Sequence, residues 1–89
     1  SKGEGFAALL EATGLTAAEC AYMGDDVIDL PVLRRVGLAI AVPDAPHSVQ
    51  THAHYVTGAR GGRGAVREAC ELILHAQGKL DAILADYLA

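Results

Sequence analysis

The sequence has few cysteines, no long apolar run and no long run of charges of one sign. Cys20 and Cys70 each lie within an apolar pattern, so we expect two reduced core thiols rather than a disulfide framework or a zinc site. A net charge of −4 without any run of like charges argues against nucleic acid as a partner. The apolar runs are short, and no basic start precedes one. We therefore expect a soluble, cytoplasmic protein with no membrane span and no signal peptide.

What is present is a short chain rich in apolar residues. Its 89 residues, 52% of them hydrophobic, allow one compact unit with a modest core. The chain begins at Ser1 rather than at a methionine, and Lys2 follows with no preceding element to anchor it. These features favour a processed or cleaved piece of a longer protein.

Apolar residues recur with helical spacing in some segments and form short uninterrupted runs in others. The first half of the pattern predicts a helix at 5–13 that ends at Gly14, one helical turn at 16–19, a strand at 20–24, a helix that continues to Gly37, and a strand at 38–42. The second half predicts a loop with one helical turn, a short strand at 54–57, a glycine-rich bend at 58–64 and a long helix from Ala65. The apolar stripe of that helix comprises Val66, Ala69, Cys70, Ile73, Leu74, Leu80, Ile83, Leu84, Tyr87 and Leu88.

Strands that alternate with helices predict an α/β fold with parallel strands and right-handed crossovers. The expected architecture is a partial, doubly wound parallel sheet of about three strands with flanking helices. Such a sheet is poorly stable on its own, because its faces and one edge need cover. We therefore expect that more chain or other subunits complete it.

Three carboxylates crowd the end of the first predicted strand, at Asp25, Asp26 and Asp29. Ligands of open α/β sheets bind beyond the carboxyl ends of the strands, which places these residues at the expected functional edge. The three side chains would raise one another's pKa unless a cation neutralised them, and Mg²⁺ accepts one or two carboxylates together with waters and phosphate oxygens. The alternative is that Asp25 and Asp26 merely cap the following helix. Residue chemistry alone leaves both interpretations open.

The segment YMGDDVIDLPVL resembles the fourth motif of the haloacid-dehalogenase-like phosphatases, in which an apolar strand ends in Gly-Asp and another acidic residue follows. Lys2 precedes Asp25 by about the distance at which that superfamily carries its phosphate-binding lysine. Together with HYVT and GGRGAVREACELIL, the segment closely resembles the C-terminal half of the 3-deoxy-D-manno-octulosonate 8-phosphate phosphatases. The resemblance covers nearly all of the chain. It implies the haloacid-dehalogenase-like (Rossmannoid) form of the fold, with residues 1–89 as the C-terminal part of one domain.

The resemblance also implies roles for individual residues. Asp25 would be the direct Mg²⁺ ligand, and Asp26 and Asp29 would hold the metal in place indirectly or through water. Lys2 would neutralise the transferred phosphoryl group and orient the nucleophile. In the family the nucleophile is an aspartate, followed two positions later by an acid/base aspartate, and no Asp-x-Asp follows an apolar run in this chain. Alone, the chain is therefore expected to be inactive.

The GGRG segment suggests a second part of the site. Glycine permits close approach of the backbone, the following helix offers free amides, and Arg63 offers a forked donor suited to phosphate or carboxylate. The resemblance implies that Gly61, Gly62 and Arg63 bind the substrate together with Lys2. It also implies a homotetramer in which neighbouring subunits help to enclose the substrate. Arg60 is a weaker candidate for such a contact, and a solvated surface position is favoured for it.

Other polar residues are expected to be structural or solvated. Arg67 and Glu68 would form weak surface pairs on the last helix. The histidines show no ligand spacing supported by the fold, and we expect solvated loop residues rather than a metal site. They are His47, His52, His54 and His75.

The function implied by the resemblance is Mg²⁺-dependent hydrolysis of 3-deoxy-D-manno-octulosonate 8-phosphate, a small phosphorylated sugar acid, in lipopolysaccharide precursor synthesis. The nucleophile would come from a missing N-terminal half of the same protein. Two alternatives stay open, namely a non-catalytic phosphatase-like module that assembles subunits and a phosphatase for a related nonulosonate 9-phosphate. A strand upstream of Ser1 that ends in Asp-x-Asp would favour an enzyme over the module.

Overall fold

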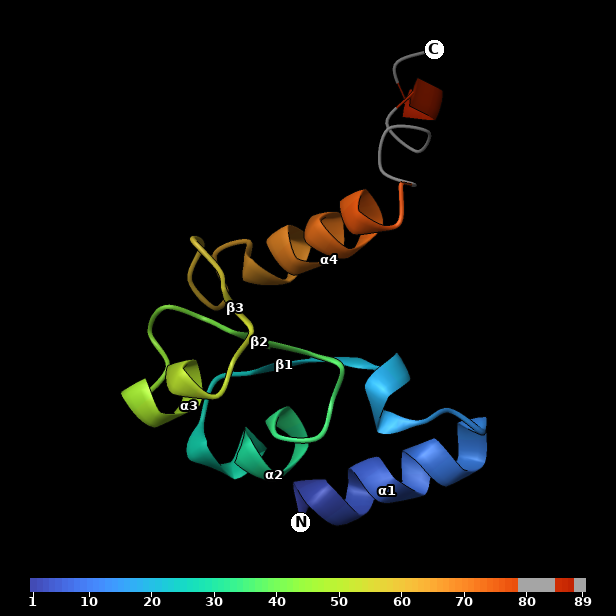
Figure 1. Cartoon of the computed structure of the whole chain (residues 1–89). Helices are drawn as coiled ribbons and strands as arrows, with labels where there is room; N and C mark the ends of the chain where they lie inside the picture. Colours follow the sequence, from blue (N-terminus) through green and yellow to red (C-terminus); the bar gives the residue numbers. More distant parts are fainter. Residues whose placement is uncertain (79–84, 88–89) are drawn as a thin grey trace.

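The computed structural model describes residues 1–78 and 85–87, which form an α/β layer structure (Figure 1). The sheet has three parallel strands, in the order β1 (Ala21–Gly24), β2 (Leu38–Ala41) and β3 (Tyr55–Val56). In the first ladder Ala21 lies opposite Leu38, and Gly24 lies opposite Ala41. The strand order and direction confirm the predicted partial parallel sheet.

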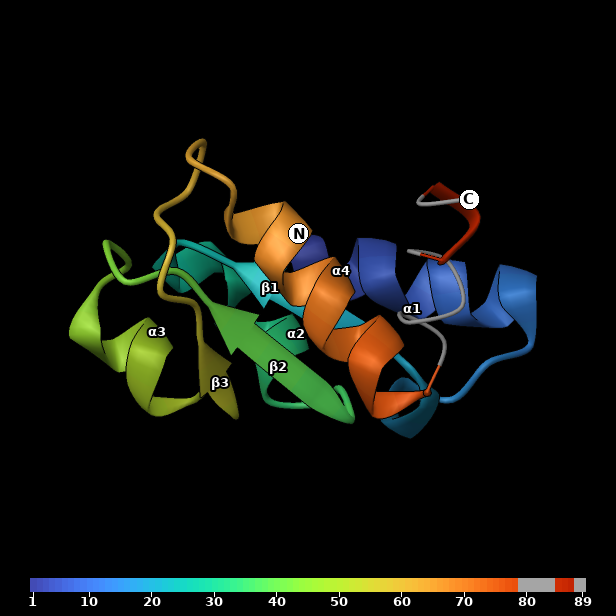
Figure 2. The ribbon, with the colours of Figure 1, turned by 90° about the horizontal axis from the view of Figure 1, so that it is seen from above.

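Helices lie on both faces of the sheet (Figures 1 and 2). On one face are α1 (Lys2–Thr13) and α2 (Leu30–Leu33), which pack against each other, and on the other face is α4 (Ala65–Ala76). The short helix α3 (His47–Thr51) packs beside a single 3-10 turn, η2 (Val27–Asp29). None of the helices described is long and apolar enough to cross a membrane.

The central strand, β2, is the most deeply buried of the three strands. Ala39, Ile40 and Ala41 of β2 are each 1% exposed or less, which confirms the prediction of a strand buried on both faces. A contiguous core cluster connects this strand to the helices. Its buried members are Phe6, Val32, Leu33, Val36, Ala39, Ala41, Val42, Ala45, Val49 and Ala65.

The first helix begins earlier than predicted, because Ser1 caps it. The Ser1 hydroxyl accepts a hydrogen bond from the Glu4 amide at 3.3 Å, so α1 begins at Lys2 rather than at position 5. It ends as predicted at Gly14, whose N–H donates to the Leu10 carbonyl. The early start places Lys2 in the first turn of a helix that packs on α2.

The helix predicted to continue to Gly37 is shorter than expected. After η2 the chain forms α2, which ends at Leu33. Gly37 closes no helix, because its N–H donates to the carbonyls of Ala17 and Cys20, and a Cβ there would lie 2.0 Å from the oxygen of Ala18. Only glycine permits this approach, which leads the chain into β2.

The sheet face that carries α4 is incompletely covered. Ala65 and Ala69 are buried, but Val66 of the predicted stripe is 67% exposed and Cys70 is also exposed. The prediction that Cys70 is a core thiol is therefore wrong, whereas Cys20 is partly buried. A cavity of about 180 Å³ lies between helix and sheet. Its walls are formed by Ala21, Tyr22, Met23, Ile40, Val66, Ala69, Cys70 and Ile73.

The edge of β1 opposite β2 has no partner strand in the part of the chain that the structure describes. Tyr87 of the predicted apolar stripe is 87% exposed, while four stripe residues lie outside the described ranges. These four are Leu80, Ile83, Leu84 and Leu88.

Candidate active site

A cavity of about 330 Å³ opens at the carboxyl ends of β1 and β2. Lys2 of α1, two acidic residues after β1 and the glycine pair before α4 all line it, although they are far apart in sequence. The predicted site residues on its walls are Lys2, Asp25, Asp29, Gly61 and Gly62, and the remaining lining residues are Met23, Gly24, Val42, Ala65 and Val66. The cavity thus lies at the edge of the sheet where a ligand site was expected.

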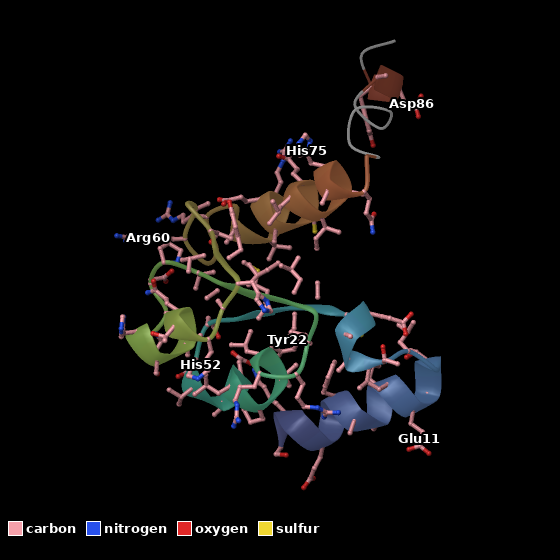
Figure 3. The ribbon with its side chains drawn as sticks, viewed as in Figure 1. Glu11, Tyr22, His52, Arg60, His75 and Asp86 are labelled. Atoms are coloured by element: carbon pink, nitrogen blue, oxygen red, sulfur yellow. The ribbon has the colours of Figure 1, made fainter. Side chains whose placement is uncertain are left out.

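Asp29 is the centre of a hydrogen-bond network beside this cavity. Its side chain is almost fully buried, and Oδ1 accepts hydrogen bonds from Lys2 Nζ at 2.6 Å and from the Tyr22 hydroxyl at 2.8 Å. Oδ2 accepts the backbone N–H groups of Asp25 at 3.0 Å and Asp26 at 3.2 Å. Two bonds to each oxygen satisfy the buried carboxylate and fix its orientation. Figure 3 labels Tyr22 of β1, whose hydroxyl reaches Asp29 at the start of α2.

The network determines the charges of its members. Burial raises the pKa of Asp29, but the hydrogen bonds from the ammonium, the phenol and two amides outweigh burial and lower this pKa to about 2. The hydrogen bond to Asp29 raises the pKa of Lys2, against a smaller opposing effect of desolvation. Burial, followed by the bond to Asp29, raises the pKa of Tyr22. At neutral pH the site therefore holds an ion pair and a neutral phenol.

Asp25 and Asp26 do not gather with Asp29 around a common point. Both are exposed, and Asp26 Oδ1 accepts the N–H of Val27 at 2.7 Å, which caps η2. The capping interpretation is thus confirmed for Asp26. Asp29 is neutralised by Lys2, which differs from the expectation that one cation relieves the repulsion among all three carboxylates. The indirect metal roles of Asp26 and Asp29 stay predictions.

One side chain on the cavity wall has the chemistry of a Mg²⁺ ligand. The Asp25 carboxylate is exposed on the cavity wall and makes no hydrogen bond to any residue that the structure describes, while its backbone is held by Asp29. In residues 1–78 and 85–87, no three His, Cys, Asp or Glu side chains form a metal-ligand cluster. Because Mg²⁺ takes one or two carboxylates and completes its shell with water and phosphate oxygens, Asp25 fits as a single protein ligand.

Gly24 lets the chain pass directly over Asp29. A Cβ at position 24 would lie 2.7 Å from the Asp29 Cβ and 3.1 Å from its Oδ2. Glycine at the end of β1 therefore allows the buried carboxylate to reach the two amides that follow. The Gly-Asp sequence is a packing requirement as well as a motif.

The glycine-rich loop contributes backbone rather than a cation to the cavity. Gly61 and Gly62 line it, the Gly61 amide donates to Asp44 Oδ1 at 3.4 Å, and Gly62 has the left-handed φ of 75°. Arg63 is exposed and does not belong to the lining, so the structure does not bring it together with Lys2. Arg60 is also exposed, on the outer side of the loop (Figure 3).

Two residues with structural roles near the cavity were missed in the sequence. Tyr22 lies in an apolar strand, and only its need for a hydroxyl partner could have singled it out. Arg67 and Glu68 were both expected to form weak surface pairs on the helix. Arg67 does so with Glu71 at 3.2 Å, but Glu68 instead accepts hydrogen bonds from the loop backbone. Neither role follows from a fixed sequence spacing.

The histidines do not come together. His52 follows α3 and His75 lies on α4, well separated in Figure 3. His54 has a structural contact, because its Nδ1 accepts the backbone N–H of Ala39 at 2.8 Å. It is thus not simply a solvated loop residue.

A comparison with models of protein families matches residues 1–68 to the haloacid dehalogenase-like hydrolases. The chain belongs to this family. The matched segment includes α1, all three strands and the glycine-rich loop, so it contains every residue of the site described above. Family membership confirms the predicted haloacid-dehalogenase-like form of the α/β fold.

Several relatives support the narrower resemblance predicted from the sequence. The Escherichia coli (strain K12) protein described as 3-deoxy-D-manno-octulosonate 8-phosphate phosphatase KdsC is 54% identical over 76 residues, which cover 85% of this chain and 40% of that protein. A crystal structure of a probable yrbi family phosphatase from Pseudomonas syringae pv. phaseolica 1448a has a TM-score of 0.96 at 51% identity, covering 99% of this chain and 50% of the other.

A third relative was crystallised with ligands. The structure of 3-deoxy-D-manno-octulosonate 8-phosphate phosphatase from Moraxella catarrhalis, in complex with magnesium ion, phosphate ion and KDO molecule, has a TM-score of 0.94 at 41% identity. It covers 97% of this chain and 49% of that chain. The resemblance to these phosphatases is thus confirmed, and the chain spans half or less of the length of the relatives described here.

Proposed function

We propose that this chain supplies half of the active site of a Mg²⁺-dependent phosphatase that hydrolyses 3-deoxy-D-manno-octulosonate 8-phosphate. The observation that carries the proposal is that Lys2, Asp25 and the Gly61–Gly62 backbone line one cavity. The family and the KdsC relatives support the reaction class. The magnesium, phosphate and KDO bound by the Moraxella catarrhalis protein support the ligand class.

Lys2 and Asp25 would have complementary roles toward the phosphate. The Lys2 side chain is 42% exposed. Its ammonium group donates one N–H to Asp29 and has two others available for phosphoryl oxygens. Asp25 would hold Mg²⁺, which when bound supplies further positive charge to the phosphoryl group. Phosphoryl transfer depends mainly on positioning and neutralisation of charge, so these two side chains address its main requirements.

The nucleophile is proposed to lie on a further strand that pairs with the edge of β1 that has no partner among the described strands. No Asp-x-Asp follows an apolar run in this chain, as the sequence already indicated. A strand parallel to β1 would end beside Asp25, because the carboxyl ends of parallel strands meet at the same edge of a sheet. The chain by itself is expected not to turn over substrate.

Phosphate release tests this proposal in the longer protein that contains the chain and the proposed strand. Asp25→Asn removes the charge of the metal ligand and keeps its size, so we expect kcat/KM with Mg²⁺ to fall by roughly 100-fold or more. The matched control is Glu11→Gln, which neutralises an exposed carboxylate of α1 remote from the cavity (Figure 3) and should leave activity unchanged. Wild-type activity in Asp25→Asn would refute the metal role.

The same assay separates the alternatives. A higher kcat/KM for a nonulosonate 9-phosphate than for 3-deoxy-D-manno-octulosonate 8-phosphate would assign the longer sugar acid as substrate. An absence of phosphate release from both, together with intact subunit assembly, would favour a non-catalytic module.

A further inference from the structure

We infer that Glu68 is a positioning residue that fixes the glycine-rich loop against the cavity and thereby sets the affinity for the substrate. The inference rests on the proposed phosphatase function, because it gives that loop the task of contacting the phosphorylated substrate. Glu68 does not line the cavity, so it would act only through the loop backbone.

One carboxylate connects three elements. Glu68 lies in the first turn of α4, and its Oε1 accepts the amides of Ala59 at 2.8 Å and Gly58 at 3.0 Å. Its Oε2 accepts the Gly58 amide at 2.8 Å and the Tyr55 hydroxyl at 2.8 Å. The side chain thus ties α4 to the end of β3 and to the first residues of the loop.

The backbone of Ala59 is held from both sides. Its N–H donates to Glu68, and its carbonyl accepts the hydroxyl of Thr57 at 2.7 Å. Thr57 is itself buried, and its amide donates to the Ala41 carbonyl at 2.9 Å, so Thr57 is tied to β2. Gly61 and Gly62 follow Ala59 by two and three residues, so only Arg60 separates the fixed backbone of Ala59 from the cavity wall.

The Glu68 side chain is negatively charged at neutral pH, which strengthens its hydrogen bonds to the loop. Hydrogen bonds from the Ala59 amide, the Gly58 amide and the Tyr55 hydroxyl lower the pKa of Glu68, so it is a carboxylate at neutral pH. Bonds to an ionised acceptor are stronger than bonds between neutral groups. Glu71, on the same helix, makes only an exposed pair with Arg67 and provides a natural comparison.

Kinetics of the longer protein test the inference. Glu68→Gln removes the charge but keeps the size and helix propensity, and we expect KM for the sugar acid phosphate to rise on the order of tenfold while kcat changes less. Glu71→Gln is the matched control and should leave both constants unchanged. A residue that only stabilised the fold would lower the melting temperature without raising KM, so an unchanged KM in folded Glu68→Gln overturns the inference.

If the Glu68→Gln variant does not fold, Tyr55→Phe provides a second test. It removes one hydrogen-bond donor to the Glu68 carboxylate and should give a smaller rise in KM. An unchanged KM in Tyr55→Phe overturns the inference equally.

Amide hydrogen exchange provides a readout that does not depend on activity. In the unaltered protein the Gly58 and Ala59 amides should be protected, and both should exchange faster in Glu68→Gln but not in Glu71→Gln. Unprotected amides in the unaltered protein overturn the positioning role whatever the substrate. Protected amides that respond to Glu68→Gln, in a protein that releases no phosphate, support the positioning role and reject the phosphatase function instead.

Discussion

Asp29 links three segments of the site through four hydrogen bonds to one buried carboxylate. Lys2 and Tyr22 approach it from α1 and β1, and the two amides belong to the turn that follows β1. In a buried position, loss of one donor leaves an anionic oxygen short of a partner and costs about 1–3 kcal/mol. The geometry of the candidate site therefore depends on residues that need not touch a substrate.

Tyr22→Phe should show this cost. The substitution keeps the ring, which packs edge-on to Phe6 at 6.5 Å between centroids, and removes only the hydroxyl donor to Asp29. We expect the free energy of unfolding in urea to fall by about 1–3 kcal/mol. Tyr87→Phe alters an exposed tyrosine and is the control. Equal stabilities of the two variants would contradict the account.

The pKa of Asp29 gives a second prediction at this scale. The folded pKa of about 2 lies below the ordinary value of 3.8, so ionised Asp29 favours the folded state. Its contribution is complete above the ordinary value and is lost as the pH falls through the folded value. The difference in pKa corresponds to roughly 2 kcal/mol.

Unfolding in the presence of a chelator should reveal that dependence. The difference in unfolding free energy between wild type and Asp29→Asn should shrink by roughly 2 kcal/mol between pH 6 and pH 2. A difference that stays constant over this range would mean that Asp29 has a similar pKa in the folded and unfolded chains.

At the scale of elements, two glycines should respond in opposite ways to alanine. Gly24→Ala places a Cβ 2.7 Å from Asp29 and should destabilise the fold by about 1–3 kcal/mol. Gly5→Ala fills open space within α1 and should stabilise it by about 0.5–1 kcal/mol. Thermal unfolding measures both. A tolerated alanine at 24 would show that the approach of β1 to Asp29 is not a constraint.

The elements that the sequence predicted correctly are those with local causes. The apolar run of β2, bounded by Gly37 and Pro43, indicated a doubly buried strand, and the spacing of Thr16 and Glu19 indicated a capped turn, η1 (Ala17–Glu19). The extent of α2 was not predictable, because the bonds of Asp29 to backbone amides shape the turn before it. After it, the Gly37 N–H donates to the carbonyls of Ala17 and Cys20 instead of closing the helix. Such tertiary contacts override helical periodicity.

The residues of the candidate site also differ in whether the sequence alone could identify them. The family resemblance singled out Lys2 and Asp25, and the structure places both on the wall of one cavity. Tyr22 and Glu68 could not be found from the sequence, because their partners are a side chain and backbone amides that only the fold brings near. Arg63 has suitable chemistry, but a loop sequence does not fix which way its side chain lies.

At the scale of the whole molecule, the described residues leave one edge of the sheet unpaired and one face incompletely covered. β1 is paired on one side only among the described strands, and Val66 and Cys70 of α4 face an apolar cavity without being buried. The site lies on this side, since Asp25 directly follows β1. The chain also spans half or less of the relatives described above. An additional parallel strand would cover the edge and approach the cavity.

Hydrogen exchange can test for that strand. Amides of β1 that point away from β2 should exchange quickly in the 89-residue chain and slowly in the longer protein that includes the proposed strand. Amides of β2 are paired in both and provide the internal control. Equal exchange of the β1 amides in the two proteins would contradict pairing at this edge.

The central claim is that Asp25 and the glycine-rich loop belong to one metal and phosphate site. The most direct measurement is titration of the longer protein, labelled with ¹⁵N, with Mn²⁺ as a paramagnetic substitute for Mg²⁺ in the presence of inorganic phosphate. The account predicts that amide signals around Asp25 broaden first, followed by those of Gly61 and Gly62, and that Asp25→Asn abolishes the effect. Broadening centred elsewhere, or unchanged in Asp25→Asn, would contradict it.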